Sequence, residues 1–360
     1  MFFHLFNALR DIIPAFRVFR YITFRTFAAT LTAVIISMAL GPWLIRRLRQ
    51  YKIGQQIREE GPKSHFNKAG TPTMGGLLIL IAVFVSTILW ADLTNEHIWI
   101  VLLSTAGFGI IGFFDDYLKL IKKHSAGLSA KHKLIGQISI SLLIAIYIYV
   151  NADGSFMTTL SIPFFKKLYP DLGVWYIPFV IFVITATSNA VNITDGLDGL
   201  AIGPSIVAAF SFAGLAYVTG NSLLAEYLNI IYVRGAGELT IFCGTILGAG
   251  LGFLWFNTFP AQVFMGDIGS LSLGGALGTV AILTKHEILL AILGGLFVIE
   301  ALSVVIQVAS FKLTGKRVFK MAPIHHHFEL KGWEEPKIIV RFWIISILLA
   351  LMSLATLKIR

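Results

Sequence analysis

Carboxylate side chains recur at the ends of long apolar stretches of this chain. Asp115 and Asp116 stand side by side in GFFDDYLKL, residues 112–120, and Asp267 lies in FMGDIGS, residues 264–270. Ionised carboxylates next to hydrocarbon are costly and are usually kept for chemistry or for handling ions. Acidic residues on separate loops suit Mg²⁺, which takes one or two carboxylates and leaves its other positions to water and substrate phosphates. These residues therefore predict a Mg²⁺-dependent site.

The spacing of the aspartate pair limits how the two side chains share a ligand. Neighbouring residues on a helix point about 100° apart, so we do not expect Asp115 and Asp116 to chelate one ion together. The structural alternative is a solvated helix end at which Lys119 neutralises the charge.

A second polar motif is NITDGLDG, residues 192–199. Asp195 and Asp198 are three residues apart, so a helical turn would place them on one face, and the glycines let a ligand approach the backbone. Asn192 adds an amide that both donates and accepts hydrogen bonds. The alternative is an Asx-rich turn that caps the following helix.

Three consecutive histidines, His325, His326 and His327, lie in APIHHHFE, residues 322–329. Consecutive histidines cannot all reach one ion from a regular helix, so we favour hydrogen bonding to phosphate over a zinc site. A purely structural role is the alternative. Two lysines, Lys68 and Lys131, stand where loops re-enter apolar stretches beside small residues, and they are the cations we favour for phosphate binding.

The elements that must position these residues are transmembrane helices. Of 360 residues, 56% are apolar and 13% are charged, which leaves too little polar surface to coat a soluble globule. Apolar runs of about 17 to 25 residues predict an all-α polytopic membrane protein, because helices of that length cross the hydrocarbon. We predict about ten spans, at residues 26–45, 74–91, 98–114, 134–150, 174–191, 200–219, 239–256, 263–283, 288–310 and 339–357.

The distribution of cations predicts the orientation. The loops after spans 1, 3 and 9 are rich in Lys and Arg, so the positive-inside rule places the odd-numbered loops in the cytoplasm and both termini outside. The arginines of residues 1–25 oppose this assignment but are outnumbered, and we interpret that segment as an amphipathic interfacial helix. We predict one catalytic domain, 1–360, with active-site loops near residues 46–73, 115–133, 188–200, 257–270 and 311–338, all facing the cytoplasm.

Carboxylates, cations and flexible glycines at a membrane surface describe a site for phosphate-bearing molecules. Phosphoryl transfer needs mainly positioning and charge neutralisation. The chain has no Walker loop and no kinase signature, so chemistry driven by ATP is not expected. A site at the membrane surface suits a water-soluble phosphate donor and a lipid acceptor. No nucleic acid partner is expected.

The motifs FFDDYLK, NAVNITDGLDGLA, FMGDIGSL and APIHHHFE, in this order over nearly the full chain, carry a resemblance. The chain resembles the polyprenyl-phosphate N-acetylhexosamine-1-phosphate transferase superfamily, in particular its phospho-N-acetylmuramoyl-pentapeptide transferase branch. The resemblance implies a bacterial inner-membrane enzyme of peptidoglycan synthesis. Undecaprenyl phosphate would attack the β-phosphorus of UDP-N-acetylmuramoyl-pentapeptide, with Mg²⁺ required, and give lipid I and UMP.

The resemblance also implies roles for individual residues. Asp267 matches the metal ligand, Asp115 the residue that deprotonates or orients the lipid phosphate, and Asp116 a second essential carboxylate. Phe264 matches an aromatic residue that stacks on uracil. The remaining positions match the nucleotide and sugar-phosphate neighbourhood: Lys68, Thr73, Asn192, Asp195, Asp198, Asn257, Gln307, His325, His326 and His327.

Three questions stay open at this point. A related transferase with a UDP-N-acetylglucosamine donor would share the aspartate motifs, although the triple histidine disfavours it. A transporter is the alternative from another class, but transporters hold ionisable groups near the bilayer midplane and often contain inverted repeats. For the reaction, we favour direct displacement over a covalent aspartyl intermediate. Asp115 and Asp116 are adjacent, and repulsion between their negative charges would raise the pKa of one of them, which suits a base. Membrane lipids surround such a chain, and a homodimer is a further expectation.

Overall fold

The computed structural model describes residues 1–51, 70–120, 127–151, 158–165 and 168–358. Across these residues the regular secondary structure is helical, and isolated bridge positions occur at Pro72 and in the pair Thr159 and Asp171. The all-α prediction is therefore confirmed. Within the same ranges, nine helices are long and apolar enough to cross a membrane.

Every predicted span except the ninth corresponds to a single helix at nearly the predicted position. The ten helices are α2 (Ile22–Gln50), α3 (Gly76–Trp90), α4 (Glu96–Leu120), α5 (Ala130–Val150), α6 (Tyr176–Thr194), α7 (Ile202–Thr219), α9 (Leu239–Asn257), α10 (Gly266–Leu283), α12 (Gly295–Thr314) and α14 (Glu335–Ala355). The shorter helices are α1 (Phe2–Leu9), η1 (Pro14–Arg20), η3 (Gly173–Trp175), α8 (Ser222–Leu228), η4 (Ala236–Glu238), α11 (Glu287–Leu293) and α13 (Ile324–Glu329).

Two predicted spans differ from the helices found. The second span is α3, which has 15 residues and is shorter than the other candidates. The ninth span, predicted at 288–310, is divided at Gly294 into α11 and α12. Glycine disfavours the helix interior, so a break at this residue is physically reasonable. Of the predicted active-site loops, those near 46–73 and 115–133 lie only partly within the described residues.

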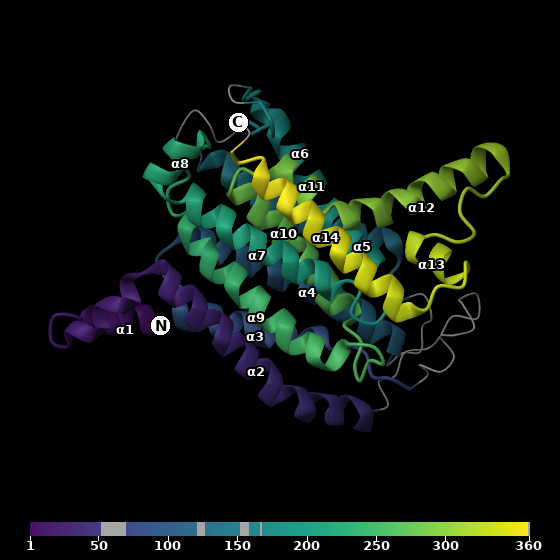
Figure 1. Cartoon of the computed structure of the whole chain (residues 1–360), viewed down its shortest axis with the longest axis horizontal. Coiled ribbons are helices and arrows are strands. Elements are labelled where there is room, and N and C mark those ends of the chain that lie inside the picture. The colour runs from purple at the N-terminus through teal and green to yellow at the C-terminus, as the bar shows by residue number, and fades with distance from the viewer. Residues whose placement is uncertain (52–69, 121–126, 152–157, 166–167, 359–360) are drawn as a thin grey trace.

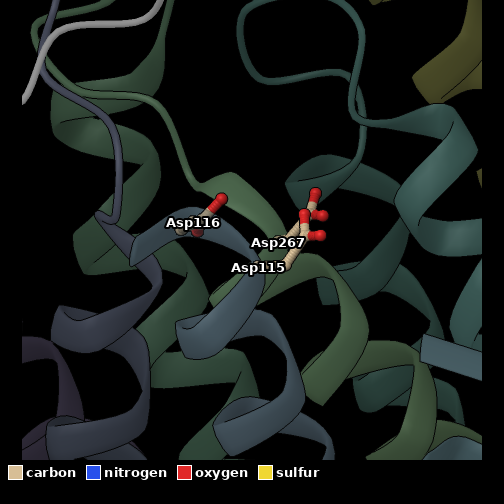
Figure 2. A group of neighbouring side chains, drawn as sticks. All are labelled: Asp115, Asp116 and Asp267. Atoms are coloured by element: carbon tan, nitrogen blue, oxygen red, sulfur yellow. The ribbon is translucent and has the colours of Figure 1, made fainter. Parts of the chain in front are cut away.

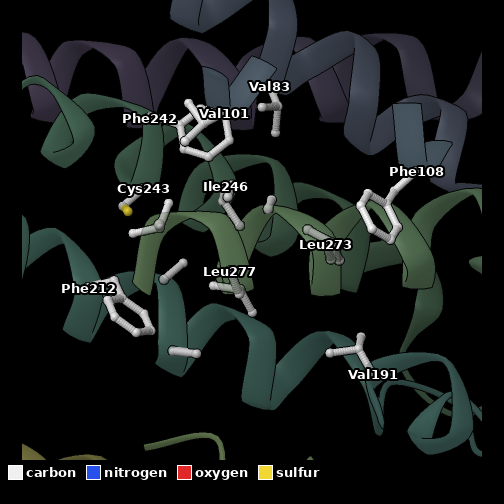
Figure 3. Packing of buried hydrophobic residues seen from close by; sticks show 14 of the residues in the cluster. Val83, Val101, Phe108, Val191, Phe212, Phe242, Cys243, Ile246, Leu273 and Leu277 are labelled. Atoms are coloured by element: carbon white, nitrogen blue, oxygen red, sulfur yellow. The ribbon is translucent and has the colours of Figure 1, made fainter. Parts of the chain in front are cut away.

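Helix α10 forms the centre of the bundle. Nearly all of its residues are buried, because α4, α6 and α3 pack around it. Leu273 and Leu277 of α10 lie among side chains from several helices, including Phe108 of α4 and Phe212 of α7 (Figure 3). Asp267 is in the first turn of this enclosed helix, so its position depends on the packing of the whole core.

The N-terminal segment forms two short helices, α1 and η1, instead of one amphipathic helix. The N-terminal end of α2 is tied to the bundle by Arg25, a buried side chain whose Nη1 donates to Glu238 Oε2 at 2.8 Å. Helix α1 and helix α13 lie at opposite ends of the molecule (Figure 1).

Candidate active site

Three carboxylates meet where α4 ends and α10 begins. Asp115 and Asp116 are buried in the last turns of α4, and Asp267 follows Gly266 at the start of α10. One oxygen from each carboxylate lies within 4.8 Å of the others. Figure 2 shows Asp115 and Asp267 side by side, with Asp116 pointing in another direction.

Two lysines neutralise part of this charge. Lys133 Nζ, from α5, donates to Asp267 Oδ2 at 2.8 Å, and Lys119 Nζ donates to the same oxygen at 3.0 Å. Lys119 also forms an ion pair with Asp115, one turn earlier on α4. Three carboxylates and two ammonium groups leave one negative charge, which a divalent cation would more than balance.

The donor set fits a hard cation. Mg²⁺ prefers oxygen ligands at about 2.0 to 2.1 Å, so the oxygens around one ion lie roughly 3 to 4 Å apart. The carboxylates therefore need little movement to share an ion, although Asp115 and Asp116 point about 100° apart on their helix. Asp115 and Asp116 are therefore both within reach of an ion bound at Asp267, whereas from the sequence we did not expect the two to share one ion. The prediction that Asp267 is the metal ligand stays a prediction.

Asn192, in the last turn of α6, orients Asp267. Its Nδ2 donates to Asp267 Oδ1 at 2.8 Å and to Ser270 Oγ at 2.8 Å. The two lysines and this amide thus hold both oxygens of Asp267. The structure thus brings Asn192 of the NITDGLDG motif into contact with Asp267.

Close backbone approach at two glycines allows the cluster to form. A Cβ at Gly112 would lie 2.3 Å from the Asp267 carbonyl oxygen, so glycine lets α4 pack directly on the start of α10. Gly266 has a φ of +74°, and a Cβ there would lie 2.6 Å from Asp116 Oδ2 and 2.9 Å from Thr73 Oγ1. Thr73 is therefore close to Asp116.

The NITDGLDG motif does not stack its aspartates on one helical face, because α6 ends at Thr194 and a turn follows. Asp198 is buried, and its Oδ2 accepts a hydrogen bond from the Ala261 backbone N–H at 2.9 Å. Burial raises the pKa of Asp195 to about 8, and the nearby carboxylates of Asp267 and Asp116 act in the same direction. Asp195 is thus influenced by the charges of the acidic cluster, whereas Asp198 supports the loop before α10.

Asn257 and Phe264 flank that loop. Asn257 is buried, accepts from the Gly199 N–H at 3.0 Å and donates to the Val263 carbonyl at 2.8 Å. Its amide therefore joins the loop to the NITDGLDG turn. Phe264 is half-buried, and its backbone N–H donates to the Pro72 carbonyl at 2.8 Å.

The three histidines of α13 point to three different partners. His325 is buried, with Nδ1 3.1 Å from Glu300 Oε2, and a Cβ on Gly196 would lie 2.3 Å from its Nε2. His326 Nδ1 is 2.6 Å from Glu329 Oε2, and His327 Nδ1 accepts from the Lys320 N–H at 3.1 Å. His325 thus packs against the NITDGLDG turn, and the three rings do not act as one equivalent set.

Two other predicted residues, Gln307 and Lys131, are not among the described contacts of the carboxylates. Gln307 holds the chain after α12, since its Oε1 accepts from the N–H groups of Val318 and Phe319. Lys131 is exposed in the first turn of α5. Lys68 lies outside the described residues.

Sequence reasoning missed four residues that shape the site. Lys133 binds Asp267, Ser270 binds Asn192, Glu300 binds His325, and the Asp198 N–H donates to Glu335 Oε1 at 3.0 Å. The cost of placing a charge inside an apolar run could have singled out Glu300, which lies within predicted span nine. Lys133 resembles any basic residue at a span end, so its role depends on the packing of α5.

These features define a polytopic membrane protein with an acidic site at one end of its helix bundle. A family model described as "Glycosyl transferase family 4" matches residues 98–285, and one described as "Phospho-N-acetylmuramoyl-pentapeptide-transferase signature 1" matches residues 68–80. Three relatives named phospho-N-acetylmuramoyl-pentapeptide-transferase align over the whole of both chains. They come from Syntrophus aciditrophicus (60% identical), Desulfosudis oleivorans (58%) and Thermodesulfovibrio yellowstonii (54%). The chain therefore belongs to the phospho-N-acetylmuramoyl-pentapeptide-transferase family, and the resemblance seen in its motifs is confirmed.

Proposed function

We propose that this chain transfers phospho-N-acetylmuramoyl-pentapeptide from its UDP conjugate to undecaprenyl phosphate. An oxygen of the lipid phosphate bonds to the β-phosphorus, and the bond from that phosphorus to the oxygen bridging it to UMP breaks. The products are lipid I and UMP. The observation that carries this proposal is the carboxylate cluster at one end of a membrane bundle, in a chain that aligns over its full length with enzymes of this name.

We propose Mg²⁺ as the cofactor, held by Asp267 with Asp115 and Asp116 within reach. When bound, the ion neutralises charge on the diphosphate as the leaving group departs. Lys119 and Lys133 hold Asp267 in place and add positive charge beside the transferring phosphate. Asp115, fixed by the Leu128 N–H at 2.8 Å, is the residue we propose to orient or deprotonate the lipid phosphate.

For substrate contacts, we propose Phe264 as the base-stacking residue and the half-buried rings of His326 and His327 as contacts to sugar and phosphate. Thr73, Asn192 and Asp195 would face the diphosphate. Asp198, Asn257, Gln307 and His325 would act by holding the loops that surround it. Lys68 and Lys131 would supply positive charge for phosphate binding.

We propose that the site faces the cytoplasm, from the bacterial inner membrane, with both termini outside. The loop charges that predict this orientation support it. We treat residues 1–360 as one catalytic domain, with residues 1–25 at the membrane interface. A homodimer stays a prediction, which light scattering of the purified protein in detergent tests.

The direct test supplies purified protein with UDP-N-acetylmuramoyl-pentapeptide, undecaprenyl phosphate and Mg²⁺. We expect release of UMP in equal amount to lipid I, and no release when the lipid or the metal is left out. Replacing the donor by UDP-N-acetylglucosamine tests the related specificity, and equal or faster UMP release with that donor would overturn the substrate assignment.

A quenched reaction separates direct displacement from a covalent route. Incubation with the nucleotide donor and Mg²⁺ in the absence of lipid should leave every aspartate unmodified. A phosphorylated aspartyl peptide, trapped and identified by mass spectrometry, would rule out direct displacement.

A further inference from the structure

A polar cavity lies at the end of the bundle away from the carboxylates. It is open to one side, has a volume of about 640 Å³ and is lined by residues of α1, η1, the start of α2 and the turn between α7 and α8. Its lining includes Arg10, Arg17, Arg20, Tyr21 and Tyr217. Neither the fold of the catalytic site nor its proposed chemistry uses this cavity.

The cavity carries an excess of positive charge. Arg17 and Arg20 form no hydrogen bond or ion pair with any described residue, and both are exposed. Arg10 donates to Asn7 Oδ1 at 2.9 Å and lies 3.8 Å from Asp11, which also lines the cavity. Three guanidinium groups therefore face one carboxylate. Arg25, only five residues after Arg20, is by contrast buried against Glu238.

The start of α2 adds to this field. Ile22 and Thr23 line the cavity, and they are the first residues of a 29-residue helix with no side-chain cap and no acidic residue in its first turn. The free N–H groups and the dipole of such a helix end favour an anion. Guanidinium groups bind phosphate through paired hydrogen bonds, so phosphate is the anion that this lining suits best.

An apolar track leads away from the cavity along α2. Phe24, Phe27, Leu31 and Ile35 are exposed, and their spacing of three to four residues places them along one side of the helix. In a membrane protein such a surface contacts acyl chains. A ligand with its phosphate in the cavity and its chains on this track would satisfy both surfaces.

We infer that the cavity formed by α1, η1 and the start of α2 binds the phosphate headgroup of an anionic phospholipid. The site is separate from the carboxylate cluster and does not depend on the proposed transfer reaction. A bound phosphate headgroup would also explain why arginines occur in the N-terminal segment, on the side of the membrane opposite to the cation-rich loops. Each arginine near a membrane surface contributes about 1 kcal/mol of attraction to anionic lipid.

The test measures lipid retention by the full chain. Wild type and an R17Q/R20Q variant are purified in mixed micelles of phosphatidylglycerol and phosphatidylcholine with matched acyl chains, and native mass spectrometry counts the lipid retained. The control is R46Q/R47Q, which removes the same charge from exposed side chains near the other end of α2. We expect retention of phosphatidylglycerol to fall about thirtyfold in R17Q/R20Q alone, the equivalent of about 1 kcal/mol for each arginine removed. An equal melting temperature of both variants in phosphatidylcholine alone shows that the fold is retained.

Two outcomes would overturn the inference. The first is an equal loss, or no loss, of phosphatidylglycerol in the two variants, because the cavity would then have no special part in lipid binding. The second is displacement of the lipid by millimolar glycerol 3-phosphate or inorganic phosphate, which would assign the cavity to soluble phosphates. Retained lipid in the presence of these anions supports the membrane source.

Discussion

The carboxyl group of Asp267 accepts hydrogen bonds from Lys119, Lys133 and Asn192. A carboxylate held by three donors from three helices has little freedom to move, and such preorganisation is what catalysis by charge stabilisation requires. The same contacts would be retained in part by an amide, so substitution by Asn tests charge with little change of shape.

We expect Asp115→Asn, Asp116→Asn and Asp267→Asn each to lower metal-dependent transfer by about 10² to 10³-fold or more, since each removes one charge from the cluster. UMP release measures the effect, and a normal yield of folded protein in the membrane shows that insertion is intact. Asp171→Asn is the matched control, because Asp171 is exposed, pairs with Thr159 in an isolated bridge, and is distant in sequence from all three. Near-normal turnover in the three cluster variants would refute the site.

Lys133 and Lys131 are close in sequence but differ in their surroundings. We expect Lys133→Gln to lower transfer about tenfold to a hundredfold, because a hydrogen bond to a charged group is worth about 1.5 to 3 kcal/mol. Lys131→Gln should cause a smaller loss, since Lys131 is exposed. Measured kcat and KM of the two variants compare the losses. A larger loss in Lys131→Gln than in Lys133→Gln would contradict the role of Lys133 at Asp267.

Asp195 gives the metal-free protein a pH dependence. Its carboxyl ionises near pH 3.8 when unfolded, whereas in the fold burial and neighbouring carboxylates raise its pKa to about 8. Between these values the folded state holds the proton more tightly, so this contribution to stability is greatest on the acidic side and is lost as pH rises through the folded pKa. The apparent melting temperature in detergent with a chelator, from pH 5 to 9, should therefore decline.

Two Asp→Asn variants test whether this pH dependence comes from Asp195. Asp195→Asn should flatten the decline, because a side-chain amide does not ionise in this pH range. Asp171→Asn should leave it unchanged, since hydrogen bonds from Thr158 and Gly173 lower the pKa of Asp171, which places its titration below the window. An identical slope in wild type and Asp195→Asn would contradict the expectation.

At the scale of elements, the packing of α4 on α10 decides where the aspartates stand. At this contact, Gly112 of α4 packs against the backbone of Asp267 and Ile268 at the start of α10. Because the neighbouring atoms belong to the backbone, no side-chain rotamer change can make room for a methyl group on Gly112. The two helices that carry the three carboxylates would have to separate.

We expect Gly112→Ala to lower the free energy of unfolding by about 1 to 3 kcal/mol, a typical cost of overpacking, and to reduce transfer. Gly214→Ala on α7 is the control, because a Cβ there meets nothing within 4 Å and alanine favours helix. Thermal unfolding and UMP release report the two effects. A stable and fully active Gly112→Ala protein would show that this contact does not position Asp267.

At the scale of the whole molecule, the direction in which the bundle crosses the membrane can be tested by labelling. The chain has one cysteine, Cys243, which is buried in α9 and gives little background. We expect Lys316→Cys, after α12, to react with an impermeant maleimide only in opened cells. Asn151→Cys, after α5, should react in intact cells. The reverse pattern would invert the proposed orientation.

The sequence by itself determined the class of fold and the parts of the site. The thickness of the hydrocarbon sets the length of a spanning helix, so ten apolar runs predicted ten helices, including the short α3. The expense of charge near lipid distinguished Asp115, Asp116 and Asp267 from the other polar residues of the chain. Because successive spans cross the membrane in alternate directions, the odd-numbered loops that carry these motifs were also predicted to lie at one end of the bundle.

The tertiary structure alone decided which side chains meet. All spanning helices have similar apolar surfaces, so hydropathy does not say which of them are neighbours, and small residues at close contacts settle it. Packing brought Lys133 and Asn192 to Asp267, directed the three histidines to separate partners, and ended α6 before Asp195 could stack with Asp198. These contacts join residues from different helices, and residue spacing along one chain carries no information about such distances.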